Sequence, residues 1–148
     1  MGAIAYDNDF YGWLLEQASL LRAGKFAEVD IEHLVDEVES MGRSEKRGLV
    51  SCVAVLLQHL LKWEYQAQRR SRSWELSIAE QRRRIPKLIQ ESPSLKPALI
   101  SIVEEAYDDA RAFVAAETGL PLSVFPKECP WTLATALDVD FFPERNGA

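Results

Sequence analysis

The sequence predicts an all-α fold, a single-domain bundle of four to five amphipathic helices with an irregular, proline-rich C-terminal segment. Two patterns predict it. Apolar residues recur at i, i+3, i+4 and i+7 in nearly every segment, and the alternation typical of a half-buried strand is almost absent. The 148 residues, 47% of them apolar and 27% charged, are enough to bury a core without disulfides or metals. We therefore expect one helical domain over residues 1–148.

Capping residues delimit the first two expected helices. Asp7 or Asn8 can cap the first helix, and Gly24 supplies the left-handed position that commonly ends one. Asp30 can cap a second helix with apolar residues along one face, and Gly42 can end it. Each helix would bury its apolar face in the bundle.

The remaining helices follow from the same signals. Ser44 can cap a third helix, which we expect to be central because an apolar stripe runs through residues 49–61. Ser73 can cap a fourth, which Pro86 should kink or restart, and Gly119 ends a fifth. The expected core helices span about 8–23, 31–41, 45–67, 74–91 and 95–118, with a short helix at about 131–137.

Charge and composition argue against several functional classes of protein. A net charge of −6 and a pI of about 5.0 argue against a general, charge-driven nucleic-acid binder. The beginning of the chain lacks the pattern of a secretory signal, and the longest uncharged apolar stretch is shorter than the roughly 20 residues of a membrane span. Cys52 and Cys129 are isolated and are expected to be buried thiols. We expect a cytoplasmic protein with no membrane partner.

Glu37 and His59 form the first candidate site. If the second and third helices are antiparallel neighbours, these side chains can meet across the groove, as an acid–base pair or as two ligands of a divalent metal. The alternative is a half-buried histidine satisfied by one hydrogen bond. Apart from such a metal we expect no cofactor. His33 has acids at i+3 and i+4 and is expected on a solvated face.

A basic strip in the middle of the chain forms the second candidate site. Residues 62–87 carry a net charge of +5, whereas the segments on either side are acidic. The strip can bind an acidic protein surface, or phosphate or nucleic acid with the help of Trp63, Tyr65 and Trp74. It can also form internal ion pairs with acids of the fifth helix. Its candidate binding residues are Arg69, Arg70, Arg72, Arg82, Arg83, Arg84 and Lys87.

Strings along essentially the whole chain resemble a bacterial family. They include Tyr6-Asp7-Asn8-Asp9-Phe10-Tyr11, Asp36-Glu37-Val38-Glu39-Ser40-Met41-Gly42, His59-Leu60-Leu61-Lys62-Trp63, Arg70-Ser71-Arg72-Ser73-Trp74 and Cys129-Pro130-Trp131. The chain resembles domain-of-unknown-function family twenty-nine, common in cyanobacteria and proteobacteria. Ala67 departs from that pattern, because the family often has proline there. The resemblance implies a helical fold and brings no settled activity.

No complete catalytic motif accompanies these sites, since neither a glycine-rich phosphate loop nor a G-x-S-x-G elbow is present. We therefore expect a binding module rather than an enzyme, one that binds another protein or a second copy of itself through the basic strip. A metal-binding or hydrolase-like bundle that uses Glu37 and His59 is the alternative. Phosphate or nucleic-acid binding through the strip is the third hypothesis.

Overall fold

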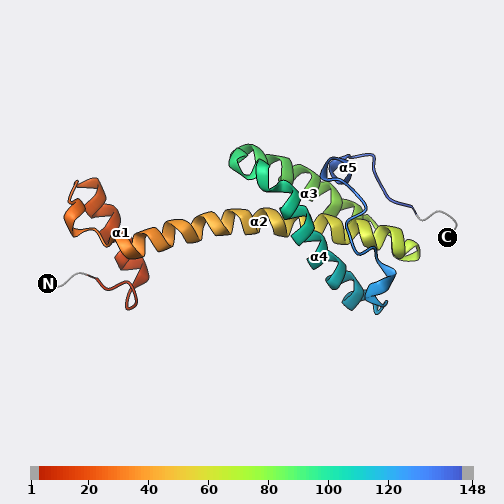
Figure 1. Cartoon of the computed structure of the whole chain (residues 1–148), viewed down its shortest axis with the longest axis horizontal. Coiled ribbons are helices and arrows are strands. Elements are labelled where there is room, and N and C mark those ends of the chain that lie inside the picture. The colour runs from red at the N-terminus through yellow and green to blue at the C-terminus, as the bar shows by residue number, and fades with distance from the viewer. Residues whose placement is uncertain (1–3, 145–148) are drawn as a thin grey trace. The chain divides into compact units, whose positions relative to one another are not determined.

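The computed structural model describes residues 4–144 and confirms the all-α fold, with no strand among those residues (Figure 1). The chain divides into two compact units, Met1–Glu45 (unit 1) and Lys46–Ala148 (unit 2), which are described separately. The expected single domain over residues 1–148 stays a prediction. The α-helices are α1 (Phe10–Arg22), α2 (Ile31–Tyr65), α3 (Arg72–Glu91), α4 (Leu99–Thr118) and α5 (Leu133–Leu137). Short 3-10 helices are η1 (Phe26–Glu28), η2 (Ala67–Arg69), η3 (Pro93–Ala98) and η4 (Leu122–Val124).

The break expected between residues 41 and 45 is wrong, because α2 continues through it as one helix of 35 residues. Gly42 does not adopt the left-handed conformation that ends a helix, which among the described glycines only Gly24 and Gly119 show. A glycine inside a helix costs about 1 kcal/mol relative to alanine, which a long helix tolerates. Ser44 therefore lies inside α2 and does not cap a helix.

Other helix ends differ by a few residues. Asp9, rather than Asp7 or Asn8, caps α1, because its carboxylate accepts a hydrogen bond from the Gly12 amide at 2.9 Å. Ser71, rather than Ser73, caps α3 in the same way.

Proline and glycine mark the later part of the chain. Pro86 lies inside α3, which does not restart there. Gly24 follows the end of α1 with φ of 73°, and Gly119 ends α4 with φ of 75°, as expected for left-handed positions. The short helix predicted at about 131–137 is present as α5, with Thr132 as its cap.

Unit 1 contains α1, η1 and the beginning of α2. Trp13 and Gln17 are the only side chains of its described residues that are buried. They lie one turn apart on α1, so a single face of that helix is covered. Most of the apolar side chains of this unit are exposed.

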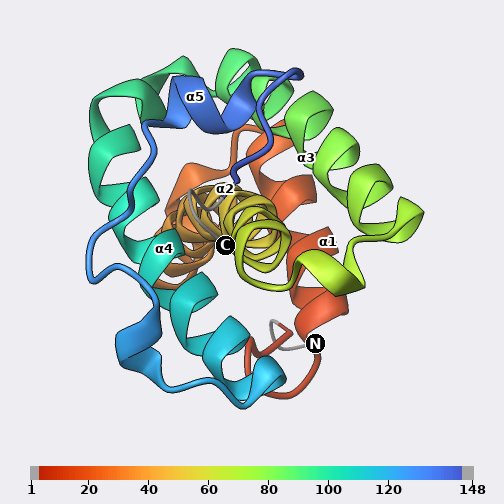
Figure 2. The same cartoon turned by 90° about the vertical axis from the view of Figure 1, so that its right-hand side faces the viewer.

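Unit 2 is built around the second part of α2. Figure 2 shows α3, α4 and α5 arranged around that helix. The central helix predicted from the apolar stripe of residues 49–61 is confirmed, because most of these side chains are buried. Fully buried residues of the core include Leu49, Val53, Leu56, Leu60, Leu61, Ile85, Ile102, Ala106, Ala110 and Val114. Within residues 4–144, no helix combines the length and apolar character needed to cross a membrane.

Candidate functional site

Glu37 and His59 are not brought together. The groove expected between two antiparallel helices does not form there, because both residues lie on α2, about six turns apart along it. Each side chain has a partner within its own unit. Glu37 accepts a short hydrogen bond from the Tyr6 hydroxyl, and the ring Nδ1 of His59 lies 2.7 Å from the Val55 carbonyl oxygen.

His59 instead matches the alternative of a half-buried histidine with one hydrogen bond. Burial lowers its pKa, and the nearby Lys62 ammonium acts in the same direction, so the neutral ring is favoured. A neutral Nδ1–H then donates to the Val55 carbonyl. Among residues 4–144 no group of three or more His, Cys, Asp or Glu side chains is arranged to hold a metal ion.

Arg82 of the basic strip serves the fold of unit 2. Its side chain is buried, and its guanidinium donates to the backbone carbonyls of Ala136 at 2.9 Å, Val139 at 3.3 Å and Phe141 at 2.6 Å. Burial lowers its pKa, and the acids at 138 and 140 oppose that shift. This corrects the expectation that Arg82 forms part of a contact surface, because its donors hold the C-terminal segment on α3.

Arg70 and Lys62 are also engaged inside unit 2. The Arg70 guanidinium donates to the Trp63 carbonyl at 2.8 Å and lies over the Trp63 ring, 5.0 Å from its centroid. Lys62 is buried, with its ammonium 3.2 Å from a carboxylate oxygen of Glu117 and 5.0 Å from the Trp74 ring centroid. These cations stabilise the packing of aromatic side chains.

The remaining cations of the strip are exposed. Arg72 has a weak partner, Glu75, at 3.5 Å on the same helix. No hydrogen bond or ion pair within residues 4–144 involves the side chains of Arg69, Arg83, Arg84 or Lys87. The internal network with acids of α4 does not form for them. We call the set Arg69, Arg72, Arg83, Arg84 and Lys87 the exposed basic surface.

Trp63 and Tyr65, two aromatic residues of the basic strip, pack against other side chains of unit 2. Trp63 lies against Phe142, with ring centroids 4.8 Å apart, and Tyr65 meets Phe125 edge to face at 4.9 Å. The Trp63 ring is also covered by Arg70. The exposed basic surface therefore offers charge without the free aromatic faces on which bases stack.

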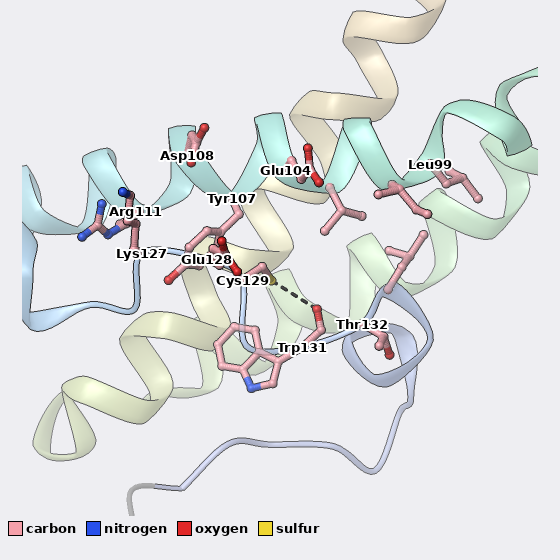
Figure 3. A pocket seen from close by; sticks show the side chains of 13 residues that line it. Leu99, Glu104, Tyr107, Asp108, Arg111, Lys127, Glu128, Cys129, Trp131 and Thr132 are labelled. Atoms are coloured by element: carbon pink, nitrogen blue, oxygen red, sulfur yellow. Dashed lines mark hydrogen bonds between the residues drawn. The ribbon is translucent and has the colours of Figure 1, made fainter.

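A pocket of about 780 Å³, which no sequence pattern indicated, lies between α4 and residues 127–133 (Figure 3). Arg111 and Lys127 lie at one end and Leu99 at the other. Such a volume falls in the usual range of ligand sites, about 300–1,000 Å³. Its lining residues are Leu99, Ile100, Val103, Glu104, Tyr107, Asp108, Arg111, Lys127, Glu128, Cys129, Trp131, Thr132 and Leu133.

Burial favours the neutral forms of two titratable groups that line this pocket. Cys129 is half-buried, its thiol lies 3.3 Å from the Trp131 carbonyl oxygen, and burial raises its pKa. The Tyr107 hydroxyl donates to the Pro126 carbonyl at 2.5 Å, and burial raises its pKa as well. A neutral thiol is a poor nucleophile, so these groups favour binding over covalent chemistry.

Unit 1 holds a polar and aromatic cluster, the Asp30 network, that was not predicted from the sequence. One carboxylate oxygen of Asp30 accepts from the Trp13 indole at 3.0 Å and lies 2.8 Å from Nδ1 of His33. Tyr6 stacks on His33 with ring centroids 4.2 Å apart, and its hydroxyl donates to Glu37. The spacing of Asp30 and His33 at i and i+3 is the local signal from which this pair can be predicted.

Electrostatics support this arrangement. The hydrogen bond from His33 lowers the pKa of Asp30, and the same bond raises the pKa of His33. The hydrogen bond to Glu37 raises the pKa of Tyr6 to about 12. The network links Tyr6 and α1 to the start of α2, so its role is to stabilise the structure of unit 1.

The family model described as "Domain of unknown function DUF29" matches residues 5–142. That range covers most of each unit and every candidate residue discussed above. No curated protein and no solved structure matches the chain.

Proposed function

The chain belongs to the DUF29 family, and from that premise we propose that it is a binding module whose exposed basic surface engages an acidic surface of another protein. The observation that carries the proposal is the division of the strip. Arg82 and Arg70 are bound to backbone carbonyls, whereas among the described residues the exposed cations have one weak partner, Glu75. Exposed cations with so few contacts in the described part of unit 2 can pair with a ligand.

The cations at the C-terminal part of α3 are the densest part of this surface. Arg83 and Arg84 lie one turn before Lys87, so the three side chains project from neighbouring positions. Glu80 and Glu91 occupy i,i+4 positions relative to them, yet no ion pair joins these acids to the cations in the described part of α3. The positive charge is therefore only partly compensated.

Two observations favour a protein over a nucleic acid. The net charge of −6 opposes binding to a long polyanion, because most of the chain outside this strip is acidic. Trp63 and Tyr65, which would have to stack on bases, pack within unit 2. A protein surface with a limited acidic patch needs neither feature, since complementary charge alone raises its association rate.

The test is affinity capture from the source cells with the full chain as bait. In R83A/R84A/K87A we expect recovery of one acidic protein to fall at least about tenfold, the effect of losing roughly 1.4 kcal/mol. The matched control is R22A/K25A/K96A, which removes three exposed cations from other elements and should capture as the wild type does. Each exposed substitution should change the free energy of unfolding by less than about 0.5 kcal/mol.

The second stage uses the purified pair. Its association rate should fall steeply between low and high salt, and the triple variant should show a weaker salt dependence. Equal capture by the triple variant and its control contradicts the proposal. Capture that disappears after nuclease treatment assigns the surface to nucleic acid instead.

A further inference from the structure

A small hollow adjoins the exposed basic surface. It has a volume of about 190 Å³ and lies between α3 and the C-terminal segment that Arg82 holds on that helix. Its lining residues are Glu75, Ile78, Ala79, Arg82, Arg83, Val139 and Phe142. Arg83 therefore lines the hollow and also belongs to the exposed basic surface.

The hollow has apolar walls. Ile78, which belongs to the core, and Phe142 contribute an aliphatic and an aromatic side chain to it. Val139, also in its lining, is 70% exposed although it is a large apolar residue. An engineered cavity of about 150 Å³ with aliphatic and aromatic walls binds benzene. A hollow of about 190 Å³ therefore has room for one phenyl ring.

Hydrogen bonds fix the wall that the C-terminal segment supplies. The guanidinium of Arg82 donates to three backbone carbonyls of that segment, including the one of Val139. Val139 lies in a turn that the Phe141 amide closes by donating to the Asp138 carbonyl at 3.0 Å. The Asp138 carboxylate accepts a second bond from the Asp140 amide at 2.9 Å. A wall held in this way loses little conformational freedom when a ligand binds.

A row of side chains on α3 connects the hollow with a further cation. Glu75, Ala79, Arg83 and Lys87 follow one another at intervals of four residues, which form a ridge along a helix. The first three line the hollow, and Lys87 continues the row one turn beyond it. Glu75 is paired with Arg72 at 3.5 Å. The other two charges of the row, on Arg83 and Lys87, have no ion pair within residues 4–144.

The two sides of the hollow differ in charge. The α3 side carries Arg83 and then Lys87. The turn side carries Asp138 and Asp140, which oppose the lowering of the Arg82 pKa that burial causes. A carboxylate of a ligand is attracted to the first side and repelled by the second. The acids of a partner are therefore expected along the row, toward Lys87.

On the basis of the function proposed above, we propose that the hollow takes one phenylalanine-sized side chain of the acidic partner. Carboxylates beside that residue pair with Arg83 and Lys87. Interfaces commonly combine an apolar anchor in a pocket with a polar rim. The anchor supplies affinity, and the ion pairs supply orientation and association rate.

The row also sets a spacing in the partner. Arg83 and Lys87 lie about 6 and about 12 Å beyond Ala79 along α3, at 1.5 Å per residue. An extended segment advances about 3.3 Å per residue, so its acids are expected about two and about four positions from the apolar residue.

The probes are synthetic glycine–serine peptides that carry one phenylalanine and two glutamates at this spacing, placed either before or after the phenylalanine. The reference peptides have alanine in place of phenylalanine. Binding to the full chain is measured by NMR titration, and the methyl groups of Ala79 and Val139 should shift most. In the tighter of the two orders, the phenylalanine peptide should bind at least about tenfold more tightly than its reference, because a phenyl ring is buried.

Two variants test the hollow itself. Ala79→Leu should remove the preference for phenylalanine, because the larger side chain fills the hollow, whereas Ala112→Leu, at an exposed position of α4, should keep it. Val139→Ser, at an exposed position, should reduce the preference without changing Tm, so the test does not depend on the stability of A79L. R83A/K87A should weaken the phenylalanine and alanine peptides by the same factor.

The outcomes separate this inference from the function on which it rests. Equal affinity for the two peptides overturns the inference, and the proposed function survives if R83A/K87A weakens both. A preference that persists in both A79L and V139S places the anchor elsewhere and also overturns the inference. Absence of binding by every peptide overturns it as well, and the capture experiment then tests the proposed function by itself.

Discussion

Unit 1 and unit 2 are both helical, but they differ in how much of their apolar surface they bury. Unit 2 buries a continuous set of aliphatic side chains, among them Leu49, Leu56 and Leu60, none of which is exposed at all. Unit 1 buries Trp13 and Gln17 and leaves most of its large apolar residues exposed. The amphipathic pattern in the sequence is similar in both units.

The difference shows that amphipathicity alone does not make a core. In unit 2, α3 and α4 cover the apolar face of α2, so its burial contributes the main stabilisation. In unit 1 the defined contacts are polar and aromatic, centred on Asp30, and they fix geometry with little apolar burial. Apolar surface that the fold leaves open is available to a second molecule.

Of the substitutions considered, Trp13→Ala should cause the largest loss of stability, and that loss should be confined to unit 1. Truncation of a buried tryptophan costs about 3–5 kcal/mol, and here it also removes the indole donor to Asp30. We expect amide protection to be lost in α1 and the start of α2, but kept over residues 49–61, as measured by hydrogen exchange. Tyr11→Ala, at a 72% exposed position of the same helix, is the control and should change little. Equal loss of protection in both units would show that they unfold together.

Leu60→Ala should act on unit 2 as a cavity in a packed core. A fully buried leucine replaced by alanine costs about 2–5 kcal/mol of unfolding free energy. Leu15→Ala, at a 55% exposed position in unit 1, should cost less than about 0.5 kcal/mol. Urea unfolding of both variants measures the difference, and similar costs would contradict the contrast between the units.

Arg82→Ala tests the division of the basic strip. It leaves three backbone carbonyls without their charged donor, and loss of such hydrogen bonds costs roughly 1.5–3 kcal/mol. Arg83→Ala, at the neighbouring exposed position, should stay within about 0.5 kcal/mol of the wild type. Thermal unfolding of the two variants distinguishes them. An equal shift in Tm would mean that Arg82 is not a structural residue.

The pH dependence of stability that comes from the two histidines is the smallest expected effect. Its sign is opposite for His33 and His59. The hydrogen bond to Asp30 raises the pKa of His33, so its stabilisation is present below about pH 6.5 and is lost as pH rises through the raised pKa. Burial lowers the pKa of His59, so its stabilisation is present above about pH 6.5 and is lost as pH falls through the lowered pKa.

An NMR titration of the ring protons measures both pKa values, because the sequence contains only 2 histidines. We expect the midpoint of His33 above 6.5 and that of His59 below it. Asp30→Asn should move only the His33 midpoint downward. Midpoints in the reverse order would contradict the environments described for the two units.

The sequence determined the helical class and several positions at which helices end. Apolar spacing marked residues 49–61 as the central helix, and Gly24 and Gly119 adopt the left-handed conformation expected of them. These features depend on residues close in the chain. Periodicity and capping are local, so they can be read from one segment at a time.

Only the tertiary structure decided what the polar residues do. Arg82 and Arg83 are neighbours of the same type, yet one is buried by a segment more than 50 residues later and the other is exposed. Glu37 and His59 were expected to meet across the groove between two antiparallel helices, but the chain remains helical between them and each bonds to a residue of its own unit. Burial and pairing depend on which distant segments pack on a helix face, and that is a property of the folded chain rather than of local spacing.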